Sequence, residues 1–196
     1  MASSTTEAPT TTASSTTTTA AAARPDNQCR RLDDFDGNGP SWLIVNDGVM
    51  GGRSQGDGSI DDSLLRFFGT VVTAGGGFTS VRTLLDGTEL TDTTFIRARV
   101  RLDDRTYGIR VEDAQEFRGR RVSHGADLPT VPENVVDDDG FAIVEVSYDE
   151  LTPTIFGQSI TAEPFDPATA IEFGLIIADG IDGGFSLDVD WIDACR

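Results

Sequence analysis

The residues with the most varied side-chain chemistry lie in one stretch, Val45–Gly56, which reads V-N-D-G-V-M-G-G-R-S-Q-G. Its glycines favour tight turns, and its polar side chains can donate and accept hydrogen bonds. It lacks the lysine and the following helical pattern of a phosphate-binding loop. We therefore expect a structured recognition loop that shares one edge with the segment Gly75–Arg82. Its side chains either grip a partner or only lock the loop. The candidate binding residues are Asn46, Asp47, Met50, Arg53, Ser54 and Arg82.

Catalytic chemistry has little support. A nucleophilic triad would need His124, the one histidine, but no G-x-S-x-G motif is present, and we expect a solvated loop histidine. The spacings of a zinc site and of a calcium-binding loop are absent. Carboxylates are abundant, and two of them facing each other across a pocket, roughly 5–10 Å apart, would favour an enzyme. The prediction is no catalytic residue, no metal and no cofactor.

The charge of the chain limits its partners. The formal net charge is -18, from 33 acidic and 15 basic residues. Such a surface repels phosphate backbones and anionic lipid surfaces. We therefore expect neither nucleic-acid binding nor membrane insertion.

A row of arginines is the exception. In the run F-I-R-A-R-V-R-L, Arg97, Arg99 and Arg101 alternate with apolar residues and share one face of a strand. Such a row either pairs with neighbouring carboxylates or lines a binding face for anions, sugars or a partner. Tyr107 is a further candidate on that face, since an exposed aromatic ring can stack on a sugar. Trp191 is in phase with apolar neighbours and is expected in the core.

Alternation with period two dominates the chain from Leu32 onward, and no window has a convincing amphipathic helix. Aspartate–glycine turn signals separate the β-rich runs. Eight or nine short strands predict an all-β fold, an antiparallel β-sandwich of jelly-roll type. Glu112–Asp139 lacks alternation and is expected to be a flap across one sheet face.

The two ends of the chain carry further signals. Residues 1–28 form a Ser/Thr/Ala-rich segment that predicts a disordered tail, and residues 29–196 would form one domain. Cys29 and Cys195 could form a disulfide if the first and last strands are neighbours. This favours an exported bacterial protein outside the cytoplasm, with a cytoplasmic location as the alternative. No mitochondrial presequence is visible.

Four segments together resemble the complex I intermediate-associated protein 30 family. They are Trp42–Gly56, Gly76–Thr83 (G-G-F-T-S-V-R-T), Asp103–Tyr107 (D-D-R-T-Y) and Gly183–Ala194 (G-G-F-S-L-D-V-D-W-I-D-A). The resemblance covers about Leu32–Ala194 and implies a galactose-binding-like jelly roll without catalysis. Mitochondrial members of that family act as assembly chaperones for respiratory NADH:ubiquinone oxidoreductase, and many bacterial members are stand-alone domains of unknown role.

Two functional hypotheses follow. The first is a non-catalytic, chaperone-like assembly module with an unknown protein partner. The alternative is a carbohydrate-binding module of the same sandwich class, which would need exposed aromatic rings and often a structural calcium ion. Binding to a glycan array would favour the second, and capture of a specific protein would favour the first.

Overall fold

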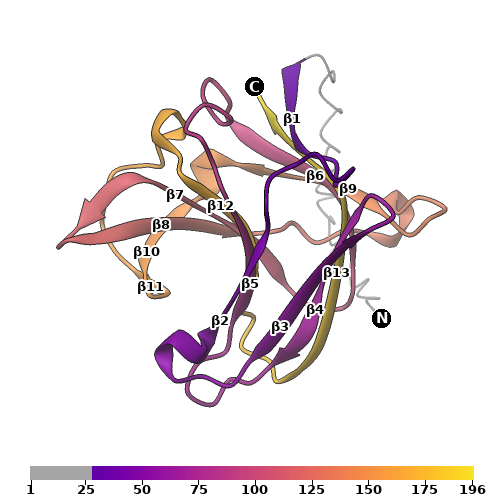
Figure 1. Cartoon of the computed structure of the whole chain (residues 1–196), viewed down its shortest axis with the longest axis horizontal. Coiled ribbons are helices and arrows are strands. Elements are labelled where there is room, and N and C mark those ends of the chain that lie inside the picture. The colour runs from indigo at the N-terminus through magenta and orange to yellow at the C-terminus, as the bar shows by residue number, and fades with distance from the viewer. Residues whose placement is uncertain (1–27) are drawn as a thin grey trace, which may run out of the picture.

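The computed structural model describes residues 28–196, so residues 1–27 of the expected tail lie outside it. The described chain is an all-β sandwich of two antiparallel sheets, as the alternation predicts (Figure 1). No helix in the described part of the chain is long and apolar enough to span a bilayer.

Sheet A contains the last strand at its centre. Its order is β3-β4-β13-β6-β9, and β1 pairs with the far end of β13. The strands are β1 (Cys29–Asp33), β3 (Gln55–Asp61), β4 (Leu64–Val71), β6 (Phe95–Leu102), β9 (Ala142–Ser147) and β13 (Gly183–Cys195). The first and last strands are therefore neighbours, and Cys29 pairs directly with Cys195. A disulfide joins these two residues, with an S–S distance of 2.05 Å.

Sheet B has the order β11-β10-β8-β7-β12-β5-β2. Its strands are β2 (Leu43–Asn46), β5 (Thr79–Leu84), β7 (Tyr107–Phe117), β8 (Arg120–Asp127), β10 (Thr152–Ile155), β11 (Gln158–Ser159) and β12 (Glu172–Ile177). Short 3₁₀ turns lie between strands: η2 (Asp47–Met50), η3 (Glu133–Val135), η4 (Tyr148–Glu150) and η5 (Pro167–Thr169).

The core lies between the two sheets. Alternate residues of each strand point inward, and the apolar ones are buried almost completely. Residues of both sheets that form this core include Phe67, Val100, Leu187, Val81, Ile109 and Leu175. The other residues of each sheet B strand must then point away from the core, which places polar side chains on the outer side of this sheet.

Three sequence expectations about the strands and loops were wrong. The segment Glu112–Asp139 is no flap, because the β7–β8 hairpin continues to Phe117 and Arg120 and only the rest connects to β9. The described residues contain thirteen strands rather than eight or nine. Trp191 is not in the core, because a bulge between Val189 and Trp191 reverses the alternation. The guanidinium of Arg31 lies 4.8 Å from the centroid of its ring instead.

Candidate functional site

The loop between β2 and β3 is organised around one buried carboxylate. Asp47 is 0% exposed and accepts hydrogen bonds from the Ser54 backbone N–H at 2.9 Å and from the Ser54 hydroxyl at 2.7 Å. The Gly77 N–H donates to the same carboxylate at 2.6 Å. Burial alone would raise the pKa of Asp47, but these hydrogen bonds outweigh it and hold that pKa below its ordinary value. Asp47 therefore ties the loop to the segment before β5.

The glycines of this motif make room for that carboxylate. A Cβ atom on Gly52 would lie 2.1 Å from the Asp47 Cγ, and one on Gly76 would lie 2.4 Å from its Oδ2. A neighbouring clamp is formed by Asn46, whose side-chain oxygen accepts the Gly56 N–H at 2.8 Å. The motif thus builds a rigid loop from polar contacts within the chain.

The remaining loop candidates lie on the surface. Val49 and Met50 are 77% and 51% exposed at the tip of η2, and Arg53 is also exposed. Arg82 lies elsewhere, on the outward side of β5. The structure therefore divides the sequence candidates into an internal lock formed by Asn46, Asp47 and Ser54, an exposed tip, and one arginine on sheet B.

The arginine row lies on the outer side of sheet A and is paired with acidic residues. Arg97 bonds to Glu145 at 2.9 Å and is 4% exposed. Arg99 donates to Asp137 and to Asp190, each at 2.6 Å. The remaining pair, Arg101 with Asp188, lies on the same face.

Tyr107 does not share that face. Its ring is 1% exposed in the core, and its hydroxyl donates to Asp103 at 2.9 Å. The reason is its position: it begins β7 of sheet B and points inward with Ile109 and Val111. It therefore cannot stack on a ligand bound outside the sandwich.

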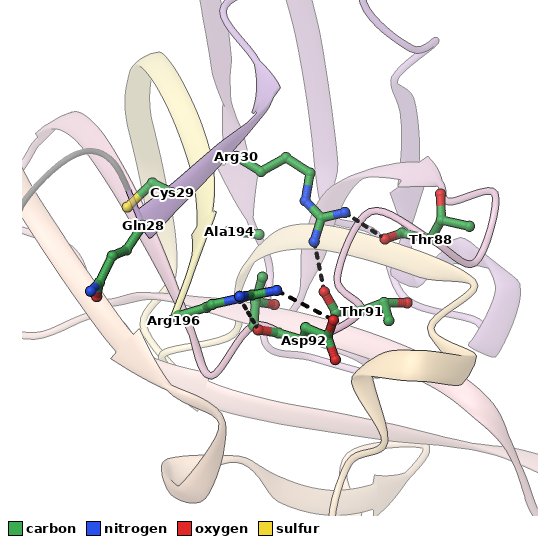
Figure 2. Close-up of a pocket in the computed structure, with 9 residues that line it drawn as sticks. Gln28, Cys29, Arg30, Thr88, Thr91, Asp92, Ala194 and Arg196 are labelled. Atoms are coloured by element: carbon green, nitrogen blue, oxygen red, sulfur yellow. Dashed lines mark hydrogen bonds and ion pairs between the residues drawn. The ribbon is translucent and has the colours of Figure 1, made fainter.

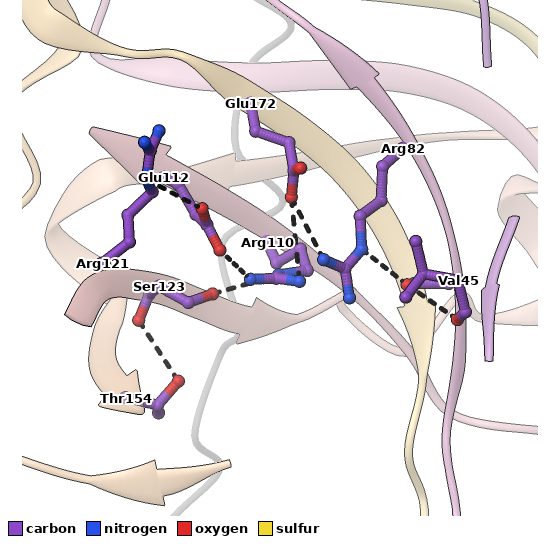
Figure 3. Close-up of polar contacts among 9 residues, drawn as sticks. Val45, Arg82, Arg110, Glu112, Arg121, Ser123, Thr154 and Glu172 are labelled. Carbon is purple, nitrogen blue, oxygen red and sulfur yellow. Dashed lines mark hydrogen bonds and ion pairs between the residues drawn. The ribbon is translucent and has the colours of Figure 1, made fainter. Parts of the chain in front are cut away.

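A second polar group lies on the outward side of sheet B, and we call it the polar face of sheet B. It contains three arginines, two glutamates and three short hydroxyl side chains: Arg82, Arg110, Arg121, Glu112, Glu172, Ser80, Ser123 and Thr154 (Figure 3). Charges of opposite sign alternate along it. The Arg82 Nη1 lies 3.3 Å from the Glu172 Oε1, and the Arg110 Nη1 lies 3.8 Å from the same oxygen.

Hydroxyl groups hold the two central arginines in place. The Arg82 Nε donates to the Ser80 hydroxyl at 2.7 Å, and the Arg110 Nε donates to the Ser123 hydroxyl at 3.0 Å. Arg110 also bonds to Glu112. Only 15% of the Arg82 side chain and 13% of the Arg110 side chain are exposed, so both guanidinium groups are fixed before any ligand arrives.

Burial and neighbouring like charges shift the pKa values of two groups on this face, Arg82 and Glu112. Burial, with the neighbouring charge of Arg110, lowers the pKa of Arg82 from its ordinary value, and Glu172 opposes the shift. Burial raises the pKa of Glu112, Arg110 opposes this, and Glu172 adds to the rise. Largely buried charges with shifted pKa values in one group are typical both of functional sites and of structural ion-pair networks.

The two glutamates do not flank a space for a substrate. Glu112 and Glu172 are direct partners on the neighbouring strands β7 and β12. Both carboxylates form ion pairs with Arg110. They stand side by side on one surface, which suits hydrogen bonding to a ligand rather than attack from opposite sides of a scissile bond.

His124 was expected in a solvated loop, and that expectation was wrong. It lies on β8, is 0% exposed, and points inward because β8 continues the alternation through Val122. Burial lowers its pKa, and nearby Asp113 opposes this. The His124 Nε2 lies 3.5 Å from the Asp113 Oδ2, and among the described residues neither ring nitrogen has a hydrogen-bond partner.

A hollow of about 630 Å³ lies beside the disulfide, between β1 and the turn before β6 (Figure 2). Arg30 crosses it and donates to the carbonyl oxygens of Thr88 at 2.9 Å and Thr91 at 2.6 Å. Arg196 reaches Asp92 from the other side. The guanidinium groups that line the hollow are thus bonded to the turn, and they fasten β1 and Arg196 to the sandwich.

Sequence reasoning missed Arg110, Glu112 and Glu172. The alternation of Tyr107–Val111 and Ile171–Ala178 contained the signal, since it predicts polar side chains on the outer face. What it does not contain is the strand order β7-β12-β5, which brings these residues next to Arg82. Among the described residues, no group of three or more metal-ligating side chains could hold a metal ion.

The fold defines the class of protein, a β-sandwich module. A profile of the family described as Complex I intermediate-associated protein 30 (CIA30) matches residues 33–189. The chain belongs to this family, as the four sequence segments indicated. No curated protein matches the chain.

Solved structures that share the fold include carbohydrate-binding modules. One is the family 11 carbohydrate-binding module of the cellulosomal cellulase Lic26A-Cel5E of Clostridium thermocellum. It has a TM-score of 0.60 and 11% identity, over 86% of this chain and 95% of that one. A family 11 module from the same organism in complex with a β-1,3-1,4-mixed-linked tetrasaccharide has a TM-score of 0.54 and 12% identity, over 85% and 95%. At such identities the likeness establishes the β-sandwich fold alone.

Proposed function

We propose that the chain is a non-catalytic binding module that holds a carbohydrate on the polar face of sheet B. The observation that carries the proposal is the fixed pair Arg82 and Arg110, with Glu172 between them. Guanidinium and carboxylate groups donate and accept paired hydrogen bonds, and neighbouring hydroxyl groups of a sugar ring can both accept and donate them. The fold shared with carbohydrate-binding modules supports the proposal.

The face has no aromatic platform among the outward residues of its strands, which are chiefly charged, hydroxyl-bearing or glycine. A sugar would therefore be held by hydrogen bonds rather than by ring stacking. We expect moderate affinity and strong dependence on the arginines.

The test is Arg110→Ala in a glycan array followed by titration calorimetry. Loss of Arg110 removes the central donor and leaves Glu112 without its nearest cation, so affinity for the best glycan falls by about tenfold or more. The matched control is Arg101→Ala, which removes an arginine paired with Asp188 on the outer side of sheet A and leaves affinity unchanged. An array on which the wild-type chain binds no glycan contradicts the proposal.

A protein-assembly role is the second candidate, and the exposed tip Val49–Met50 favours it. The tip is apolar and exposed, and Asp47 fixes its base. An exposed apolar pair on a rigid loop suits an anchor in a partner's pocket. Membership of the CIA30 family supports a partner in a multi-protein assembly.

The corresponding experiment is a crosslinking pull-down with the wild-type chain and the double variant Val49→Ser, Met50→Ser. We expect the wild type to capture a specific protein and the variant to lose it, because both substitutions remove apolar contact area without touching the core. Arg110→Ala should retain the partner. Equal capture by the tip variant would contradict a role for this surface.

A further inference from the structure

The two central arginines of the polar face of sheet B stand on either side of one glycine. Gly174 is the direct partner of Arg82 across β5 and of Arg110 across β7. A Cβ atom at Gly174 would lie 2.9 Å from the Arg82 Cγ. The absence of a side chain at Gly174 therefore lets the aliphatic part of Arg82 lie against the sheet. The guanidinium groups of Arg82 and Arg110 lie next to each other (Figure 3).

One carboxylate oxygen of Glu172 forms ion pairs with both guanidinium groups, and both distances are long. The distances to Arg82 and Arg110 are 3.3 and 3.8 Å. Charge-assisted N–H···O bonds are about 2.7–2.9 Å long. A guanidinium carries five N–H donors, and among the described residues the Arg82 Nη2 has no hydrogen-bond acceptor. Hydrogen-bond donors of these two arginines, including the Arg82 Nη2, are thus still available to a ligand.

Exposed Glu116, the cross-strand partner of Arg121, balances the charge of that arginine, so arginines are not in excess on this face. The charge of Arg110 nevertheless lowers the pKa of Arg82, so the two central guanidinium groups repel each other. An anion placed between Arg82 and Arg110 would relieve their repulsion and take up the remaining donors. A planar carboxylate fits guanidinium groups in a bidentate manner.

We infer that the polar face of sheet B recognises a hexuronic acid residue, whose carboxylate bonds to Arg82 and Arg110 in competition with Glu172. The inference rests on the proposed function and names the class of sugar. Glu112 already accepts from Arg110, and the Thr154 hydroxyl donates to the Ser123 carbonyl oxygen at 3.2 Å. Each oxygen has a further lone pair that can accept from a hydroxyl group of the same ligand. The strongly acidic chain disfavours long polyanions and leaves short uronate oligosaccharides as the ligand class.

Titration calorimetry with three sets of trisaccharides tests this inference. The first set contains trisaccharides of galacturonic, glucuronic and mannuronic acid, the second their methyl esters, and the third the corresponding neutral hexose trisaccharides. Salt at about 0.15 M limits the reach of the distant acidic residues to about 8 Å. We expect at least one uronate to bind about tenfold or more tightly than its own ester and its neutral counterpart.

Two substitutions should change the affinity in opposite directions, so that misfolding cannot imitate the pattern. Arg82→Gln removes one guanidinium and weakens binding of the uronate by about tenfold or more. Glu172→Gln removes the internal carboxylate that competes for both arginines, and uronate binding tightens by about threefold or more. Binding of the methyl ester changes little with Glu172→Gln. Arg101→Gln, on the other sheet, is the control.

The outcomes separate the two proposals. Tighter binding of an acid than of its ester, with opposite effects of the two variants, supports the inference. Equal affinity for acid, ester and neutral sugar, or array binding to neutral glycans alone, overturns the inference that the site recognises a carboxylate. The proposed function, carbohydrate binding, then still stands. Absence of binding to all three sets and to a broad glycan array overturns both.

Discussion

Asp47→Ala is expected to lower the free energy of unfolding by about 3–5 kcal/mol, because it leaves several buried N–H groups without an acceptor. The carboxylate accepts from the Ser54 N–H and hydroxyl and from the Gly77 N–H, and it is completely buried. The cavity that remains lies next to two glycines, which offer no side chain to fill it. Urea unfolding followed by circular dichroism measures the loss.

The matched control is Asp61→Ala, which replaces an exposed aspartate on the edge strand β3, with an expected change within about 0.5 kcal/mol.

A second experiment varies the pH. Because the folded-state pKa of Asp47 lies below its ordinary value, its contribution is present above the unfolded pKa of about 3.9 and is lost as pH falls through the folded value. The difference in the free energy of unfolding between wild type and Asp47→Ala should therefore become smaller below about pH 4. A constant gap from pH 7 to pH 2 would contradict the role of the charge.

Loss of the disulfide is the second large effect. The double variant Cys29→Ser, Cys195→Ser should lose about 2–5 kcal/mol of stability, because the bond closes a loop with a sequence separation of 166 and restricts the unfolded chain. The bond also holds β1 against β13, where the pairing ends. The measurement is the urea midpoint with and without a reducing agent.

The control for this prediction is the double variant itself, whose midpoint should not respond to the reducing agent. Wild-type protein in reducing agent should approach the midpoint of the variant. A wild-type midpoint that stays unchanged, once free thiols have been confirmed by titration, would show that the bond contributes nothing to equilibrium stability.

Much of the sandwich could be predicted because alternation in a strand reports directly which face is buried. Ile96, Ala98 and Val100 point inward as their spacing predicts. The prediction failed where alternation is broken or masked. A bulge reversed the phase before Trp191, and another between Glu112 and Glu116 interrupted the pattern of β7.

The candidate site was harder to predict because it depends on strand order. The sequence identified Arg82 by its motif but gave no reason to join it to Arg110, which lies on a strand two positions away in sheet B. The family motif also drew attention to Asp47, whose contacts serve the loop itself. Local patterns identify rigid segments, whereas a binding face needs residues that are distant in sequence.

The position of the disulfide has a mechanical consequence. Cys29 and Cys195 are paired at one end of the sandwich, where β1 begins and β13 ends, and η2 lies at the opposite end (Figure 1). A pull applied through the two ends of the domain would be carried across a covalent bond and would not reach the strands between them. After reduction the same pull would peel β1 from β13 one residue pair at a time, the weakest direction in which an antiparallel pair can be loaded. The oxidised domain would bear tension without extending, and the reduced domain would open from this end.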